Sequence, residues 1–246
     1  MTWFLKHRFK ILLASLLTVL VLLPVIVDFA GQVDPRAKAF LVFGFTSLFL
    51  LASLLVLSDH RRTLMAALCI LVPTLVFGTL ARFLEPGRWI VLDHLLRMGF
   101  HVFVIVVLLG YLFRPGFVTL DTVSASLCVY LVLGVLWENV FSILETLRPG
   151  SIVLSDAAQA RTGGSASDLS RTMEMLYFSY ATLTSLGYGD IVPKTSSARM
   201  FAVAEALTGQ LYLVVMVSRL VSMYGTQAFA PPVSREPESG QEDVGT

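Results

Sequence analysis

Residues 182–190 read TLTSLGYGD, and they lie between two long apolar stretches of the chain. Gly187 and Gly189 flank a tyrosine, and Asp190 follows directly. Glycine accepts backbone angles that residues with side chains resist, so this segment suits a non-helical backbone. At membrane depth such a backbone is tolerated only where protein or a water-filled cavity surrounds it. The segment therefore predicts a pore or a cavity.

The composition around this segment is that of an integral membrane protein. Of the 246 residues, 56% are hydrophobic and 14% are charged, whereas soluble domains carry about 25% charged residues. A formal net charge of +1 argues against a nucleic-acid partner. The sequence contains no Walker loop, HExxH motif or other catalytic set, so we expect neither an enzyme nor a cofactor.

Long apolar stretches predict six transmembrane helices, because about 20 apolar residues span the hydrocarbon core. They lie at about 11–28, 38–57, 64–81, 94–113, 121–143 and 199–223. Between the last two, residues 171–184 predict a short helix with Ser170 as its N-cap. At 1.5 Å per residue this helix reaches only about 20 Å, too short to cross. A short helix that is followed by glycines and returns to the same side is a re-entrant loop.

The segment TLTSLGYGD resembles the selectivity filter of potassium channels, whose pattern is Thr residues followed by Val/Ile-Gly-Tyr-Gly-Asp. The resemblance covers about residues 121–223. It implies that backbone carbonyls replace the hydration oxygens of K⁺, and that the Ser185 hydroxyl completes the innermost ion site. The carbonyls of Ser185, Leu186, Gly187 and Tyr188 would bind K⁺, and Gly189 would complete the filter. K⁺ is then the permeant ion, not a cofactor.

One chain supplies one filter strand, so the resemblance also implies a homotetramer around a central axis. We expect an all-α membrane protein with six transmembrane helices, and with a re-entrant pore helix and selectivity filter between helices five and six. The expected regions are a four-helix part without an assigned role (1–117), a pore domain (118–224) and a disordered cytoplasmic tail (225–246). The basic residues Lys6, Arg8 and Lys10 predict cytoplasmic termini for a multi-pass protein of the plasma membrane.

Two filter positions depart from the commonest pattern of that family. Ser185 stands where Thr is usual, and Leu186 stands where Val or Ile is usual. The serine keeps the hydroxyl, so these departures affect the rigidity of the filter more than its choice of ion. The main prediction is a potassium-selective channel. Two alternatives stay open: a poorly selective cation channel, and an accessory subunit that does not conduct alone.

Several polar residues around the filter are expected to support it. Asp190 should accept a hydrogen bond from Tyr177, and Thr184 should help to hold the filter. Intramembrane carboxyl groups are functional candidates, and we expect Glu138 and Glu205 to hydrogen-bond the pore-helix backbone. Gly209 is a candidate gating bend in the last helix, with close helix packing as an equal alternative.

The fourth expected helix carries little of the chemistry of a voltage sensor. Steep voltage dependence needs several gating charges per subunit, and Arg97 is the single permanent positive charge in this helix. We therefore expect opening to depend weakly on voltage. His94, Arg97 and His101 share one helical face, which leaves open a proton sensor or simple polar contacts.

Overall fold

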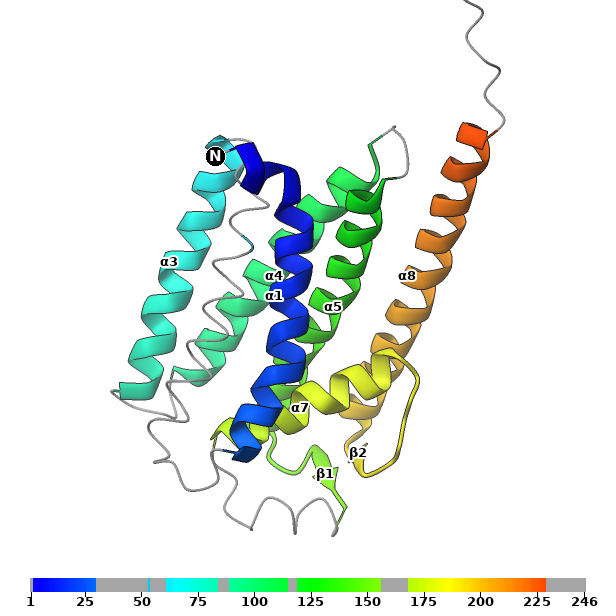
Figure 1. Cartoon of the computed structure of the whole chain (residues 1–246). Coiled ribbons are helices and arrows are strands. Elements are labelled where there is room, and N and C mark those ends of the chain that lie inside the picture. Colours follow the sequence, from blue (N-terminus) through cyan, green and yellow to red (C-terminus); the bar gives the residue numbers. More distant parts are fainter. Residues whose placement is uncertain are drawn as a thin grey trace, which may run out of the picture.

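The computed structural model describes residues 2–29, 53, 61–83, 89–114, 119–155 and 168–228. Within these residues, helices form a bundle whose long members run side by side, while a shorter helix crosses one end (Figure 1). The elements in chain order are α1 (Thr2–Phe29), α3 (Arg61–Phe83), α4 (Ile90–Leu112), α5 (Leu120–Leu147), β1 (Ile152–Leu154), α7 (Asp168–Leu183), β2 (Ile191–Pro193) and α8 (Ser196–Ala228).

Four of the described helices, α3, α4, α5 and α8, are long and apolar enough to cross a membrane. Each covers one of the expected stretches, and α1 covers the first of them. The second expected stretch, 38–57, lies outside the described residues apart from Ser53. The expectation of a helical, multi-pass membrane protein is confirmed at this level.

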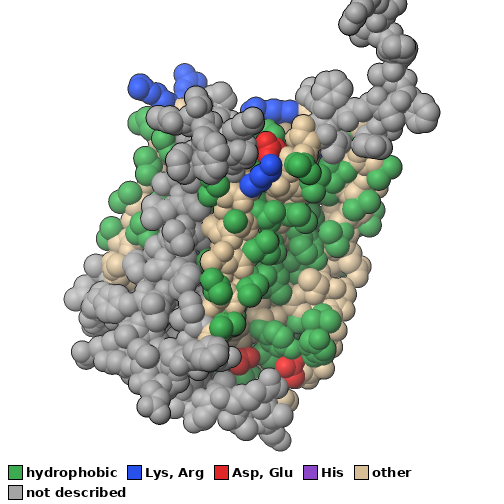
Figure 2. Space-filling model, viewed as in Figure 1, with side chains coloured by type: hydrophobic (Ala, Val, Ile, Leu, Met, Phe, Trp, Pro, Cys, Tyr) green, Lys and Arg blue, Asp and Glu red, His purple; other side chains and the backbone are tan. Residues whose placement is uncertain are grey.

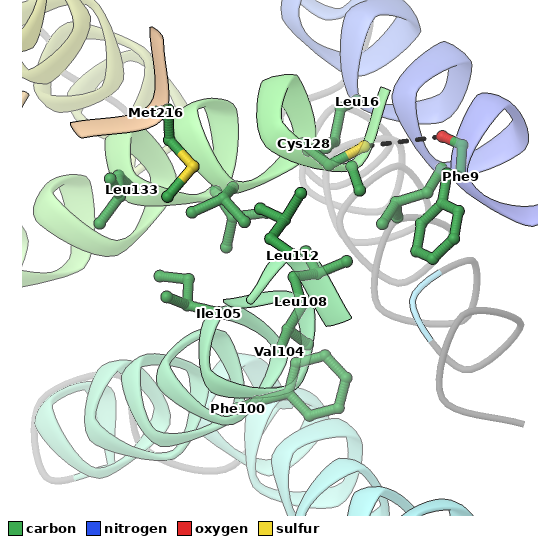
Figure 3. Packing of buried hydrophobic residues seen from close by; sticks show 14 of the residues in the cluster. Phe9, Leu16, Phe100, Val104, Ile105, Leu108, Leu112, Cys128, Leu133 and Met216 are labelled. Carbon is green, nitrogen blue, oxygen red and sulfur yellow. Dashed lines mark hydrogen bonds between the residues drawn. The ribbon is translucent and has the colours of Figure 1, made fainter. Parts of the chain in front are cut away.

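The core of the bundle lies between α4 and α5, and α1 closes one side of it. On α4, Phe100, Val104 and Leu108 recur every fourth residue, share one face of the helix and are fully buried. They pack with buried α5 residues such as Cys128, whose thiol donates to the carbonyl oxygen of Phe9 on α1 at 3.6 Å (Figure 3). One continuous core therefore joins α1, α3 and α4 to α5.

Basic residues from three elements meet at the end of the bundle where α4 finishes. The Arg8 guanidinium stacks over the Tyr111 ring, and Arg219 Nη2 donates to the carbonyl oxygen of Arg114 at 3.2 Å. Figure 2 shows Lys and Arg side chains at this upper end, with hydrophobic side chains over the middle of the same face. The start of α1 and the last turns of α8 thus lie at the same end of the bundle.

The opposite end holds α7 and a small sheet, in the region where the sequence predicts the re-entrant loop. β1 and β2 form an antiparallel pair in which Ile152 faces Pro193 and Leu154 faces Ile191. The sequence does not predict this pair. It also places one boundary too late, since α7 begins at Asp168 and already contains Ser170, the expected N-cap. At the other end of the pore part, α8 continues to Ala228, past the expected domain boundary at residue 224.

Candidate functional site

The filter segment, residues 185–190, directly follows Thr184, the C-cap of α7. Leu186 N–H donates to the carbonyl oxygen of Ala181 at 2.8 Å, and Ser185 N–H donates to that of Thr182 at 3.0 Å. These two bonds are the pair that defines the Schellman motif, in which the residue after the C-cap takes a left-handed conformation. That residue is Ser185, with φ of 59°. Glycine is the usual residue there, so the first filter residue holds a strained backbone.

The sign of φ alternates along the filter segment. Ser185, Gly187 and Gly189 have φ of 59°, 52° and 80°, while Leu186 and Tyr188 are not in the positive region. In an extended strand successive carbonyls point to opposite sides. A reversal of φ at every second residue turns them toward one side, which suits the ligation of a cation on that side. The sequence analysis assigned this conformation to the two glycines and missed Ser185.

The outer end of the filter segment is tied to α7 and to β1. The Tyr177 hydroxyl lies 3.0 Å from Asp190 Oδ1 and 3.1 Å from Oδ2, so this phenol donates to the aspartate. Ser155 N–H donates to the carbonyl oxygen of Asp190 at 2.7 Å, where the β1–β2 pairing begins. Asp190 is therefore held through both its side chain and its backbone.

Glu145, at the end of α5, anchors the strand that holds the filter. Its Oε1 accepts from Gly150 N–H at 2.8 Å, and its Oε2 accepts from Ile152 N–H at 3.0 Å. The carboxylate is buried, with 6% of the residue exposed. Hydrogen bonds to a charged group are among the stronger ones in proteins. Glu145 is not among the residues predicted from the sequence. The available signal was its position five residues before Gly150 and seven residues before Ile152, the two residues whose N–H groups donate to its carboxylate.

Hydroxyl groups of α7 and α8 attach to backbone carbonyls of α5. Tyr180 Oη donates to the Leu131 oxygen at 2.7 Å, and Tyr212 Oη donates to the Ser126 oxygen at 2.7 Å. Gly134 allows the closest of these approaches, because a Cβ at this position would overlap the Tyr180 ring. The pore helix thus packs directly on the backbone of α5.

Glu205 joins this contact from the third helix, α8. It is fully buried, and its Oε1 lies 2.5 Å from the Ser179 hydroxyl on α7. The same hydroxyl lies 2.7 Å from the carbonyl oxygen of Gly134 on α5. Glu205 therefore contacts a side chain of α7 and not, as predicted, its backbone, and its support of the filter stays a prediction.

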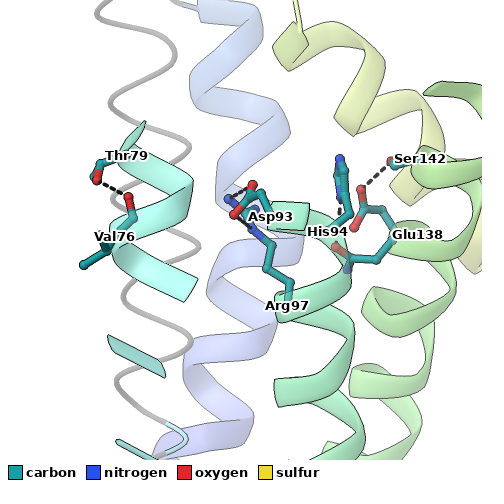
Figure 4. A network of polar contacts seen from close by, with 8 residues as sticks. Val76, Thr79, Asp93, His94, Arg97, Glu138 and Ser142 are labelled. Atoms are coloured by element: carbon teal, nitrogen blue, oxygen red, sulfur yellow. Dashed lines mark hydrogen bonds and ion pairs between the residues drawn. The ribbon is translucent and has the colours of Figure 1, made fainter. Parts of the chain in front are cut away.

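Glu138 differs from its expected role. It is buried on α5, where its Oε1 accepts from Ser142 of the same helix at 2.8 Å (Figure 4). The neighbouring Asn139 Oδ1 accepts from His94 Nδ1 on α4 at 3.0 Å. These contacts belong to the interface of α4 with α5, and the expected hydrogen bond from Glu138 to the pore-helix backbone is not among them. Ser142 lies one turn after Glu138 on the same helix, so the carboxyl group finds its hydrogen-bond donor within α5. The sequence alone does not distinguish such a bond from one between two helices.

The polar face of α4 is paired within the protein. Arg97 forms an ion pair with Asp93, one turn earlier on the same helix, with Nη2 2.8 Å from Oδ2. His101 is buried, with 3% exposed. The single permanent positive charge of α4 is thus neutralised by a carboxylate of its own helix. Whether the face that carries His94, Arg97 and His101 senses protons stays an open prediction.

Two further residues approach the inner end of the filter segment. The Thr184 hydroxyl donates to the carbonyl oxygen of Tyr180 at 2.6 Å, which returns it to the pore helix. At Gly209 on α8, an added Cβ would lie 2.5 Å from the carbonyl oxygen of Leu183. Gly209 therefore permits α8 to touch the end of the pore helix, and its expected role as a bend stays a prediction.

Comparisons with known proteins identify the region that contains this site. Residues 141–225 match the model of a family described as ion channel. The chain is 26% identical over 128 residues to the voltage-gated potassium channel Kch of Escherichia coli, which is 52% of this chain and 26% of that protein. It is 37% identical over 93 residues to the human potassium channel subfamily K member 17, which is 34% of this chain and 28% of that protein.

A plant protein is also similar over a shorter stretch. The two-pore potassium channel 4 of Arabidopsis thaliana is 38% identical over 50 residues, 20% of this chain and 18% of that protein. The matches therefore span less than a third of the length of these relatives. No solved structure matches the chain. The family and these relatives are channels and not enzymes, in agreement with the expectation from the sequence.

Proposed function

We infer that this chain belongs to the potassium channels, and we propose that it conducts K⁺ passively through a homotetrameric, potassium-selective pore in the plasma membrane. One observation carries the proposal: φ is positive at Ser185, Gly187 and Gly189, directly after α7. We propose that this alternation turns successive carbonyls to one side. A ring of such carbonyls replaces the hydration shell of K⁺. The negative end of the α7 dipole lies at the start of the same segment and favours a cation there.

Exposure in the single chain supports assembly around the filter. Leu186 is 54% exposed and Tyr188 is 70% exposed. The face of α8 adds further uncovered apolar side chains, among them Leu207, Leu211 and Val214. Apolar patches of this kind mark contacts with protein or with lipid. Neighbouring subunits would cover the filter side, and lipid would cover the outer side.

The proposal includes a re-entrant pore loop and a cytoplasmic position for both termini. Helix α7 has 16 residues, about 24 Å of helix, which is too short to cross the hydrocarbon core. The basic cluster before the first apolar stretch, Lys6, Arg8 and Lys10, favours a cytoplasmic position for its end of the bundle, so we propose that the filter segment opens toward the outside. We expect weak voltage dependence because Arg97, the permanent charge of α4, is paired with Asp93.

Ion flux into liposomes that contain the purified protein tests this function. With K⁺ inside and an impermeant cation outside, we expect uptake of a tracer such as Rb⁺, and little uptake when Na⁺ replaces K⁺. Gly187→Ala is the comparison variant, because a side chain at φ of 52° is strained, and it should lower uptake. Equal flux with K⁺ and Na⁺ would favour the poorly selective channel. Absence of flux from a protein that is not a tetramer by native mass spectrometry would favour the accessory subunit.

A further inference from the structure

The residue after Gly209 reaches the first residue of the filter. Gln210 Nε2 lies 3.2 Å from Ser185 Oγ, so the amide donates to the hydroxyl oxygen. This contact depends on the absence of a side chain at residue 209, where α8 touches the carbonyl oxygen of Leu183. The two consecutive residues therefore act together: the glycine brings the inner helix to the pore helix, and the glutamine extends to the filter.

The chemistry of Ser185 explains why such a contact matters. A serine hydroxyl has one proton and two acceptor positions. One N–H from Gln210 occupies one acceptor position and leaves the other for a cation. Serine also lacks the γ-methyl group that restricts the χ1 angle of threonine, so its hydroxyl turns more freely unless a neighbour holds it.

Among the described residues, Gln210 is the one side chain that hydrogen-bonds to the Ser185 hydroxyl. Thr184, the adjacent residue, already donates to the carbonyl oxygen of Tyr180. The Schellman motif uses the backbone N–H of Ser185, which is bonded to Thr182, and this bond does not orient the side chain. Gln210 is thus the side chain that positions the hydroxyl at the inner end of the filter segment.

We propose that Gln210 is a positioning residue for ion selection, which holds the Ser185 hydroxyl toward the ion path and replaces the restraint that a threonine methyl would give. This inference rests on the proposed function. It assigns to α8 a part in the innermost ion site, to which the resemblance assigns Ser185 alone. Loss of one hydrogen bond at this exposed position should change the K⁺/Na⁺ permeability ratio by roughly two- to tenfold.

A double-mutant cycle on the full chain in planar bilayers tests the proposal. The four proteins are the wild type, Gln210→Leu, Ser185→Ala and the double variant, and the readout is the K⁺/Na⁺ permeability ratio from reversal potentials. We expect each single variant to lower the ratio by roughly two- to tenfold, and the double variant to lower it no further, because both remove the same contact. Independent, multiplying effects would overturn the inference, as would an unchanged ratio in Gln210→Leu.

A second variant keeps the test decisive if Ser185→Ala does not conduct. Gln210→Asn preserves the amide and the polarity of the surface but shortens the side chain by one methylene group, so it should lower the ratio as Gln210→Leu does. A wild-type ratio in Gln210→Asn would show that polarity, not contact, matters, and would overturn the inference. If the wild-type protein carries no K⁺ current, the proposed function is contradicted and this inference loses its basis. If the wild type conducts normally and the Gln210 variants keep its K⁺/Na⁺ permeability ratio, only the inference is contradicted.

Discussion

Ser179 and Glu205 share a hydrogen bond whose geometry requires a proton on the buried carboxyl group of Glu205. The Ser179 hydroxyl lies 2.5 Å from Glu205 Oε1 and 2.7 Å from the carbonyl oxygen of Gly134. A hydroxyl has one proton to donate, and a backbone carbonyl can only accept. Both contacts are satisfied when Ser179 donates to Gly134 and a protonated Glu205 donates to Ser179.

This relationship predicts that Glu205 is a neutral carboxylic acid in the folded protein. We expect an infrared band of a protonated carboxyl group that disappears in Glu205→Gln. The same substitution should change stability by less than about 1 kcal/mol, since the amide can donate to Ser179. Glu205→Ala should cost more than about 2 kcal/mol, because it removes the donor and leaves a cavity. Glu138→Gln provides the control spectrum, and an unchanged band in Glu205→Gln would contradict the assignment.

The substitution Gly209→Ala distinguishes a packing role of this glycine from a role as a hinge in α8. Gly209→Ala places a Cβ 2.5 Å from the carbonyl oxygen of Leu183, so α8 must move away from the pore helix. We expect a loss of stability of about 1–3 kcal/mol, measured as a lower midpoint of thermal unfolding in detergent.

Gly99→Ala on α4 is the matched control, since nothing lies within 4 Å of a Cβ at that position. It should leave stability unchanged or raise it by about 0.5–1 kcal/mol. If Gly209→Ala alters the open probability but unfolds like the wild type, the residue acts as a bend and the packing account is wrong.

Glu145 should control the strand that holds the outer end of the filter. Glu145→Ala leaves the N–H groups of Gly150 and Ile152 without their acceptor, which we expect to cost about 2–4 kcal/mol. Glu145→Gln keeps one acceptor oxygen and should cost about half as much. Hydrogen exchange of the amides in β1 reports the effect directly, and unchanged protection of Ile152 in Glu145→Ala would refute it.

Tyr177→Phe tests the contact between the pore helix and Asp190. The substitution removes the hydroxyl, which donates its one proton between the two carboxylate oxygens of Asp190, and leaves the ring in place. Tyr177 is 36% exposed, so solvent can replace part of the bond, and we expect a cost of about 1 kcal/mol or less. Single-channel recording should show more frequent brief closures in symmetric K⁺. Dwell times equal to those of the wild type would show that Asp190 is held by its backbone bond to Ser155 alone.

The fold was predictable wherever a long apolar pattern marks a helix. The stretches at 64–81, 94–113, 121–143 and 199–223 are each covered by a described helix, because burial and membrane length both require the same residues. The two short strands escaped prediction, since three residues carry no periodicity of their own. They form only because Glu145 and the turn before Ile152 bring SIVLS beside DIVP.

The candidate site was predictable from residue types but not from geometry. The glycines at 187 and 189 indicate positive φ, whereas Ser185 takes it because the helix before it ends in a Schellman motif. The contact of Gln210 depends on how closely α8 approaches α7. This distance follows from tertiary packing, and in particular from the missing side chain at Gly209.

The reversal potential of the purified protein in a planar bilayer, under opposed K⁺ and Na⁺ gradients, tests the central claim most directly. The carbonyls of the filter segment should select K⁺, so we expect a reversal potential close to the potassium equilibrium potential. Gly187→Ala in the same membrane is the control for leak current. A clear current that depends on the wild-type filter but reverses near zero would contradict potassium selectivity.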